Sequence, residues 1–124
     1  MPKKVIIVDD SRVLRQVVRL ALEAGGYEVV EAQDGVEGLR QMAAHPDAAL
    51  VISDVNMPKM DGMEMLEAAR QDPATAGLKF VMVTTEAEPE VMRRGKALGA
   101  KGWIVKPFKA DLLVAAVHRL VGDP

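Results

Sequence analysis

The sequence contains no cysteine, which excludes disulfide bridges, thiolate nucleophiles and cysteine-bound metal sites. Aromatic residues make up only 3% of the chain, and there are two histidines. Neither sign of charge predominates, because 16 basic and 18 acidic side chains give a formal net charge of -2. This balance predicts no general attraction to nucleic acid or to anionic membranes.

Long hydrophobic runs are also missing. The first apolar run, residues 5–8, is far too short to span a bilayer and is followed at once by two aspartates. No signal peptide is visible. We therefore expect a cytoplasmic protein without membrane insertion. The 124 residues, 49% of them apolar, can form one real core, so a single domain over residues 1–124 is predicted.

Five short apolar runs, rich in β-branched residues, predict strands at residues 5–8, 28–30, 49–52, 80–83 and 103–105. Most of the runs are continuous rather than alternating, which is typical of strands buried on both faces. The second run is shorter and is flanked by Glu28 and Glu31, which favours an edge strand.

Segments with helical spacing of apolar residues lie between and after these runs, and the first ends at Gly25-Gly26. The alternation of strand and helix predicts an α/β protein with a parallel sheet and right-handed crossovers. The predicted apolar positions are Val13, Val17, Leu20 and Ala21 in the first helix, Leu39 and Met42 in the second, Met65, Leu66 and Ala69 in the third, Val91, Met92, Gly95 and Leu98 in the fourth, and Leu112, Leu113, Ala116, Val117 and Leu120 in the fifth.

Polar residues occupy the carboxyl ends of four predicted strands. These ends lie along one edge of a parallel sheet, where ligands bind. Three carboxylates, a hydroxyl and an ammonium group are therefore expected to converge there. The residues are Asp9-Asp10 after the first strand, Ser53-Asp54 after the third, Thr84-Thr85 after the fourth and Lys106 after the fifth.

Three crowded carboxylates repel one another, so they need a cation or one of them must hold a proton. Oxygen ligands without nearby histidine or sulfur favour Mg²⁺ or Mn²⁺. With a lysine and a hydroxyl close by, such a site suits phosphoryl chemistry, in which a carboxylate can act as the nucleophile. Each motif alone has a simpler explanation as a turn or helix cap, and only the joint placement favours a site.

The same residues resemble the signature of response-regulator receiver domains over essentially the whole chain. The likeness is greatest to the single-domain chemotaxis regulators (CheY-type). It implies a flavodoxin-like (βα)5 fold, a doubly wound five-stranded parallel sheet of order 2-1-3-4-5 with helices on both faces. The matching motifs are Asp9-Asp10, Asp54-Val55-Asn56-Met57-Pro58, Met60-Asp61-Gly62, Thr84-Thr85-Glu86-Ala87 and Lys106-Pro107-Phe108.

The resemblance implies a role for each acid at the site. Asp54 would accept the phosphoryl group. Asp10 and Asp54, with the backbone carbonyl of Asn56, would hold Mg²⁺, and Asp9 would assist through a water molecule. The protein would thus be a phosphoacceptor that assists its own phosphorylation and dephosphorylation, rather than an enzyme with a separate substrate.

Further roles are implied for the remaining strand-end residues. Lys106 would pair with Asp54 and then with the phosphoryl group, and it would precede a cis peptide bond to Pro107. Thr84 would swing inward to a phosphoryl oxygen. Asn56 and Glu86 occupy the two positions that tune the rate of hydrolysis in the family, although both can also be read as ordinary loop residues.

An output face is expected around the fourth helix and fifth strand, where Ala87, Met92, Lys96 and Trp103 could bind a partner and Thr84 would act as the switch. The family often has a tyrosine or phenylalanine at the position of Trp103. An indole is larger and offers only one N–H donor. Whether this ring moves on activation or simply packs on the strand is left open.

The function expected from these residues is a phosphorylation-dependent switch of a two-component system. A histidine kinase would phosphorylate Asp54, and the protein, as a monomer, would signal to a partner such as a motor switch component, in chemotaxis or motility control. A phosphorelay intermediate or a phosphate sink would share this site. An aspartyl-phosphate phosphatase is disfavoured because Asn56 stands where such enzymes carry a second acid. A binding module that is never phosphorylated is the remaining alternative.

Overall fold

The structure is a computed structural model that describes residues 2–85 and 88–124, and within them strands and helices alternate along the chain. The strands are β1 (Lys4–Val8), β2 (Glu28–Ala32), β3 (Leu50–Asp54), β4 (Phe80–Thr84) and β5 (Gly102–Val105). The helices are α1 (Arg12–Ala24), α2 (Gly35–Ala44), α3 (Gly62–Gln71), α4 (Pro89–Ala97) and α5 (Ala110–Val121).

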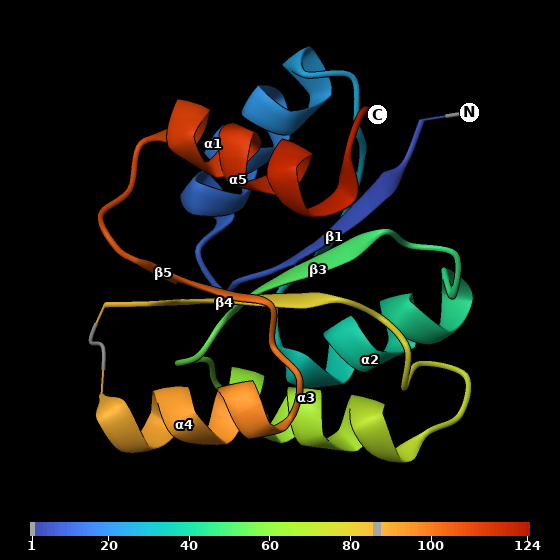
Figure 1. The fold of residues 1–124 in the computed structure, drawn as a ribbon, viewed down its shortest axis with the longest axis vertical. Coiled ribbons are helices and arrows are strands. Elements are labelled where there is room, and N and C mark those ends of the chain that lie inside the picture. Colours follow the sequence, from blue (N-terminus) through green and yellow to red (C-terminus); the bar gives the residue numbers. More distant parts are fainter. Residues whose placement is uncertain (1, 86–87) are drawn as a thin grey trace.

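All strand pairs formed by the described residues are parallel, and the order β2-β1-β3-β4-β5 confirms the predicted fold class and the edge position of β2. Helices α1 and α5 cover one face of the sheet, and α2, α3 and α4 cover the other (Figure 1). The fold is therefore the doubly wound α/β arrangement that the sequence predicts.

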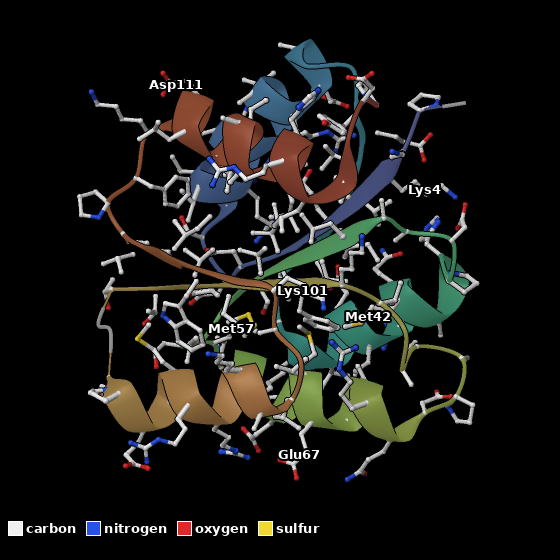
Figure 2. The ribbon with its side chains drawn as sticks, in the orientation of Figure 1. Lys4, Met42, Met57, Glu67, Lys101 and Asp111 are labelled. Atoms are coloured by element: carbon white, nitrogen blue, oxygen red, sulfur yellow. The ribbon has the colours of Figure 1, made fainter. Side chains whose placement is uncertain are left out.

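Alternate residues of each strand enter two separate cores, because successive side chains point to opposite faces of a sheet. In β1, Val5 and Ile7 pack on the side of α1 and α5, whereas Ile6 and Val8 pack on the side of α2 and α3. Figure 2 shows Met42 between α2 and the sheet, where it is fully buried. Both faces are covered, so the strands read as continuous apolar runs.

Local sequence signals set the helix ends. The side chains of Ser11, Asp34 and Asp61 accept hydrogen bonds from the first turns of α1, α2 and α3. Gly25 and Gly26 end α1 as predicted, and Gly26 has a positive φ of 96°. The connections that follow β1, β2 and β3 therefore each end in a residue whose side chain caps the next helix.

The predicted inward face of α1 is wrong. Val13, Val17 and Leu20 are 73%, 46% and 62% exposed. The buried face consists instead of Val18 and Leu22, spaced by one helical turn, with Leu14 partly buried on the same core. The helix carries two neighbouring apolar stripes, so its rotation depends on tertiary contacts that periodicity does not reveal.

Those contacts come from the edge strand. Arg15 and Arg19 of α1 both donate hydrogen bonds to the carboxylate of Glu31 on β2. This turns the Leu14–Val18 side of the helix toward the sheet. In α5, Leu113 and Val117 are buried as predicted, but Leu112 is 62% exposed. Every helix among residues 2–85 and 88–124 is too short or too polar to cross a bilayer.

Candidate functional site

Asp9 and Asp54 become neighbours because of the register of the central strands. Val8, the last residue of β1, pairs with Ser53 of β3, so the next residue along each strand is an aspartate at the same edge. With Asp10, these acids form a group in which one carboxylate oxygen of each residue lies within 4.8 Å of the others. The convergence expected at the strand ends is therefore present in the fold.

Lys106 reaches this group from the end of β5. Its Nζ lies 3.1 Å from Oδ2 of Asp9 and 3.2 Å from Oδ2 of Asp54. The backbone N–H of Lys106 donates to the carbonyl of Thr84 at 2.7 Å, which ties the lysine to the end of β4. The peptide bond between Lys106 and Pro107 is cis, as the family resemblance implies.

Burial and charge shape the protonation of these groups. Burial, followed by the negative charge of Asp9, raises the pKa of Asp54 above its ordinary value, against the opposing effect of Lys106 and of the backbone of Asn56. Burial alone would lower the pKa of Lys106, but its hydrogen bonds with Asp9 and Asp54 raise it overall. Lys106 is therefore a cation at neutral pH, held between two carboxylates.

The donor set fits a hard divalent cation. If all three acids ionise together, their charges exceed that of the one ammonium group by two, which a divalent cation would neutralise. The cluster contains aspartates alone, and Mg²⁺ prefers such oxygen ligands. Asp10 is exposed whereas Asp9 and Asp54 are 4% and 6% exposed, so an ion could be reached from solvent on the Asp10 side.

Local backbone interactions hold the acids in place. Oδ1 of Asp9 accepts a hydrogen bond from the N–H of Ser11 at 2.8 Å, and the carbonyl of Asp9 accepts one from Arg15. Asp54 ends β3, and a Cβ atom built at Gly62, the first residue of α3, would lie only 2.1 Å from the carbonyl oxygen of Asp54. Residue 62 must therefore be glycine for α3 to begin so close to the acid.

The other predicted site residues occupy the same edge. Thr84 is the last residue of β4 and is 2% exposed. Asn56 is exposed and lies two residues beyond Asp54, in the connection to α3. Glu86 and Ala87, predicted to tune hydrolysis and to form part of the output face, lie outside the described residues.

Three predicted output residues line one groove. Met92 and Lys96 of α4 and Trp103 of β5 border a groove of about 450 Å³ between that helix and the edge strand. Among the described residues, Nε1 of Trp103 is buried without a hydrogen-bond partner. Arg93 and Lys101 add further positive charge at the groove, so its lining is apolar with a cationic border.

Two glycines allow backbone segments to approach one another closely around the acids, a role that the sequence alone does not predict. Residues 34–35 and 61–62 are both Asp-Gly pairs, and each pair begins a helix with the aspartate as cap. Asp61-Gly62 is predicted as turn and helix-start chemistry and as part of a family motif, whereas no role is predicted for the 34–35 pair. The repeated dipeptide was the available signal, but only coordinates show which backbone each glycine meets.

Comparisons with known proteins agree with this geometry. Residues 5–118 match the model of the response regulator receiver domain family. Chemotaxis protein CheY1 of Helicobacter pylori is 36% identical over 121 residues, covering 96% of this chain and 97% of that protein.

Solved structures give the same result. Chemotaxis protein CheY4 of Vibrio cholerae superposes with a TM-score of 0.90 at 42% identity, covering 97% of this chain and 99% of that one. A chain of the CheX–CheY–BeF3–Mg²⁺ complex from Borrelia burgdorferi gives a TM-score of 0.88 at 26% identity, covering 96% and 89% of the two chains. The chain described here therefore belongs to the response-regulator receiver domain family of two-component signal transduction.

Proposed function

We propose that residues 1–124 form a single receiver domain that takes a phosphoryl group onto Asp54 from the phosphohistidine of a histidine kinase. The observation that carries this proposal is the contact of a nearly buried Asp54 carboxylate with Lys106, beside Asp9 and Asp10. In the transfer, a carboxylate oxygen of Asp54 bonds to phosphorus as the P–N bond to the histidine breaks, and the imidazole leaves.

The neighbouring residues stabilise this transfer. Asp10, Asp54 and the carbonyl of Asn56 would hold Mg²⁺, with Asp9 acting through water, and the ion would offset charge on the transferring oxygens. Lys106, already 3.2 Å from Asp54, would remain paired with the new phosphoryl group. The hydroxyl of Thr84 would donate a hydrogen bond to a phosphoryl oxygen.

Phosphorylation would then select one of two states of the domain. Thr84 ends β4, and the chain leads from there into α4, so a shift of its side chain is carried toward the groove between α4 and β5. Met92, Lys96 and Trp103 line this groove. We infer that a downstream protein binds there, in control of chemotaxis or motility. Asn56 would border the path of the hydrolytic water.

Acetyl phosphate with Mg²⁺ tests the central step. The wild-type protein is expected to gain the mass of one phosphoryl group, and Asp54→Asn is expected to gain none. Asp61→Asn is the matched control, because Asp61 caps α3 outside the acid group and asparagine also caps helices well. A protein whose mass stays unchanged with acetyl phosphate, and which does not respond to beryllofluoride, would exclude the switch.

A further inference from the structure

The segment of residues 55–61 follows Asp54 and carries Asn56, whose carbonyl is proposed to bind Mg²⁺. We call this segment the metal loop. Its base is closed by a hydrogen bond from the N–H of Gly62 to the carbonyl of Val55 at 2.8 Å. The loop is also held at its start by the backbone of Asn56, which hydrogen-bonds to the carboxylate of Asp54, and by Met57, which packs against the core. An attachment at the far end of the loop would complete this fixation.

That attachment is at the tip, where the loop meets the start of α2. The N–H of Gly35 donates to the carbonyl of Met60 at 3.2 Å. Beside it, Nζ of Lys59 lies 3.7 Å from Oδ2 of Asp34. Lys59 has a φ of 67°, a left-handed conformation that is uncommon for a residue other than glycine. The tip is thus held in one unusual backbone conformation against a helix from a distant part of the sequence.

Only glycine fits at position 35. A Cβ atom built there would lie 2.6 Å from the carbonyl oxygen of Met60 and 2.7 Å from its Cγ. The clash is with loop backbone, which cannot give way without moving the loop. We propose that Gly35 is a positioning residue for the metal: its missing side chain lets α2 hold the tip of the metal loop so that Asn56 faces the acids. This inference rests on the proposed function.

Gly38 provides a matched control in the same helix. It is also buried, and a Cβ atom built there would also meet a neighbour at 2.6 Å. That neighbour is Sδ of Met65, in a flexible core side chain, and the next nearest atoms are the two Cγ atoms of Val8 at 3.2 Å; none of them belongs to the loop. Gly38→Ala therefore adds the same methyl group to the same helix and leaves the contact with Met60 in place.

The experiment measures Mg²⁺ affinity by calorimetric titration with MgCl2, on wild type and both variants, after urea unfolding has shown that each is folded. Gly35→Ala is expected to weaken Mg²⁺ binding by roughly tenfold, as loss of groups that orient metal ligands usually does. Gly38→Ala is expected to bind Mg²⁺ like wild type. In metal-free protein, amide hydrogen exchange in residues 55–61 is expected to quicken in Gly35→Ala alone.

A second pair of variants answers the question if Gly35→Ala fails to fold. Asp34 is buried, and its Oδ1 caps α2 by accepting from the N–H of Glu37 at 2.9 Å. Asp34→Ala loosens the turn that contains Gly35 and is expected to weaken Mg²⁺ binding several-fold. Asp34→Ser keeps a hydroxyl that can cap the helix, and its Mg²⁺ affinity is expected to fall much less.

The outcomes separate this inference from the proposed function. Absence of Mg²⁺ binding by the wild-type protein would overturn the proposed function itself. Mg²⁺ binding by wild type with equal affinity in Gly35→Ala, or an equal loss in Gly35→Ala and Gly38→Ala, would overturn only the role of Gly35. For the second pair, Mg²⁺ affinity of Asp34→Ala equal to that of wild type would do the same.

Discussion

Gly95 of α4 lies against the indole ring of Trp103 on β5: a Cβ atom added to the glycine would come within 2.7 Å of Cζ3 of that ring. The same ring lines the groove between this helix and β5. The distance between α4 and β5 is therefore set by an aromatic ring packed on a residue without a side chain.

Gly95→Ala is expected to displace the ring and to lower the free energy of unfolding by about 1–3 kcal/mol, the usual effect of overpacking. Trp103 is the only tryptophan, so its fluorescence emission reports the displacement directly. Gly77→Ala is the control, because a Cβ atom there meets nothing within 4 Å among the described residues. Equal emission spectra for Gly95→Ala and wild type would show that the ring does not depend on this contact.

Arg70 ties the end of α3 to two other connections. Arg70→Met keeps the apolar part of the side chain but removes its hydrogen bonds. We therefore expect the free energy of unfolding, measured with urea, to fall by on the order of 3 kcal/mol. The guanidinium of Arg70 donates hydrogen bonds to four backbone carbonyls, those of Leu98 at 2.7 Å, Ala76 at 2.8 Å, Leu78 at 2.7 Å and Gly99 at 3.4 Å. It also lies 5.1 Å from the ring centre of Phe80.

Arg93→Met serves as the comparison for Arg70. Its side chain is 71% exposed, and among residues 2–85 and 88–124 it pairs with Glu90 along the helix surface. Its replacement is expected to change the free energy of unfolding by less than about 0.5 kcal/mol. Equal losses in the two variants would mean that the carbonyl contacts of Arg70 add nothing to stability.

Mg²⁺ is expected to stabilise the wild-type fold through the proposed site. At 100 times its dissociation constant, a ligand that binds only the folded state adds about 2.7 kcal/mol. Asp10→Asn should abolish this gain, measured as the shift of the urea midpoint on adding MgCl2. Asp10 is exposed and is not one of the two acids that contact Lys106, and its replacement relieves repulsion among the acids, so without metal the variant should be at least as stable as wild type. An undiminished Mg²⁺ effect in Asp10→Asn would contradict its role as a ligand.

The Glu31 contacts predict a dependence of stability on pH. Burial by itself raises the pKa of Glu31, but the hydrogen bonds from Arg19 and Arg15 outweigh it and lower the pKa below the ordinary 4.5. A carboxyl group whose pKa is lowered by folding stabilises the protein at pH values above its ordinary pKa. This stabilisation is lost as the pH falls through the lowered pKa of the folded state. Wild type should exceed Glu31→Gln by about 1 kcal/mol at pH 7. When urea unfolding is repeated at a series of acid pH values, this difference in the free energy of unfolding should disappear below pH 4.5. A difference that stays constant with pH would contradict the stabilising role of the Glu31 contacts.

The fold and the acid group could be read from the sequence because both follow from local patterns. Continuous apolar runs indicate buried parallel strands, and such strands must bring residues such as Asp9 and Asp54 to one edge. The helix starts at Asp34 and Asp61 follow equally from local capping chemistry. These features depend on residues a few positions apart and on the general geometry of a parallel sheet.

The features that were missed depend on contacts between distant segments. The rotation of α1 follows from the bonds of Arg15 and Arg19 to Glu31, which lies 16 and 12 residues away. The partners of Arg70 are backbone carbonyls, which every residue has, so no side-chain pattern indicates them. The fit of Gly35 against Met60 is likewise a matter of packing that only coordinates reveal.

Lys3, before β1, lies beside the end of α5, at the opposite end of the strand from the acid group. Figure 1 shows N and C at one end of the molecule, and the side chain of Lys3 donates to the carbonyl of Val121. Tyr27, which precedes β2, donates its hydroxyl to the carbonyl of Gly122 at 2.6 Å. A surface anchor or a fluorescent tag attached at either terminus would consequently leave the approach to Asp54 open to an incoming donor.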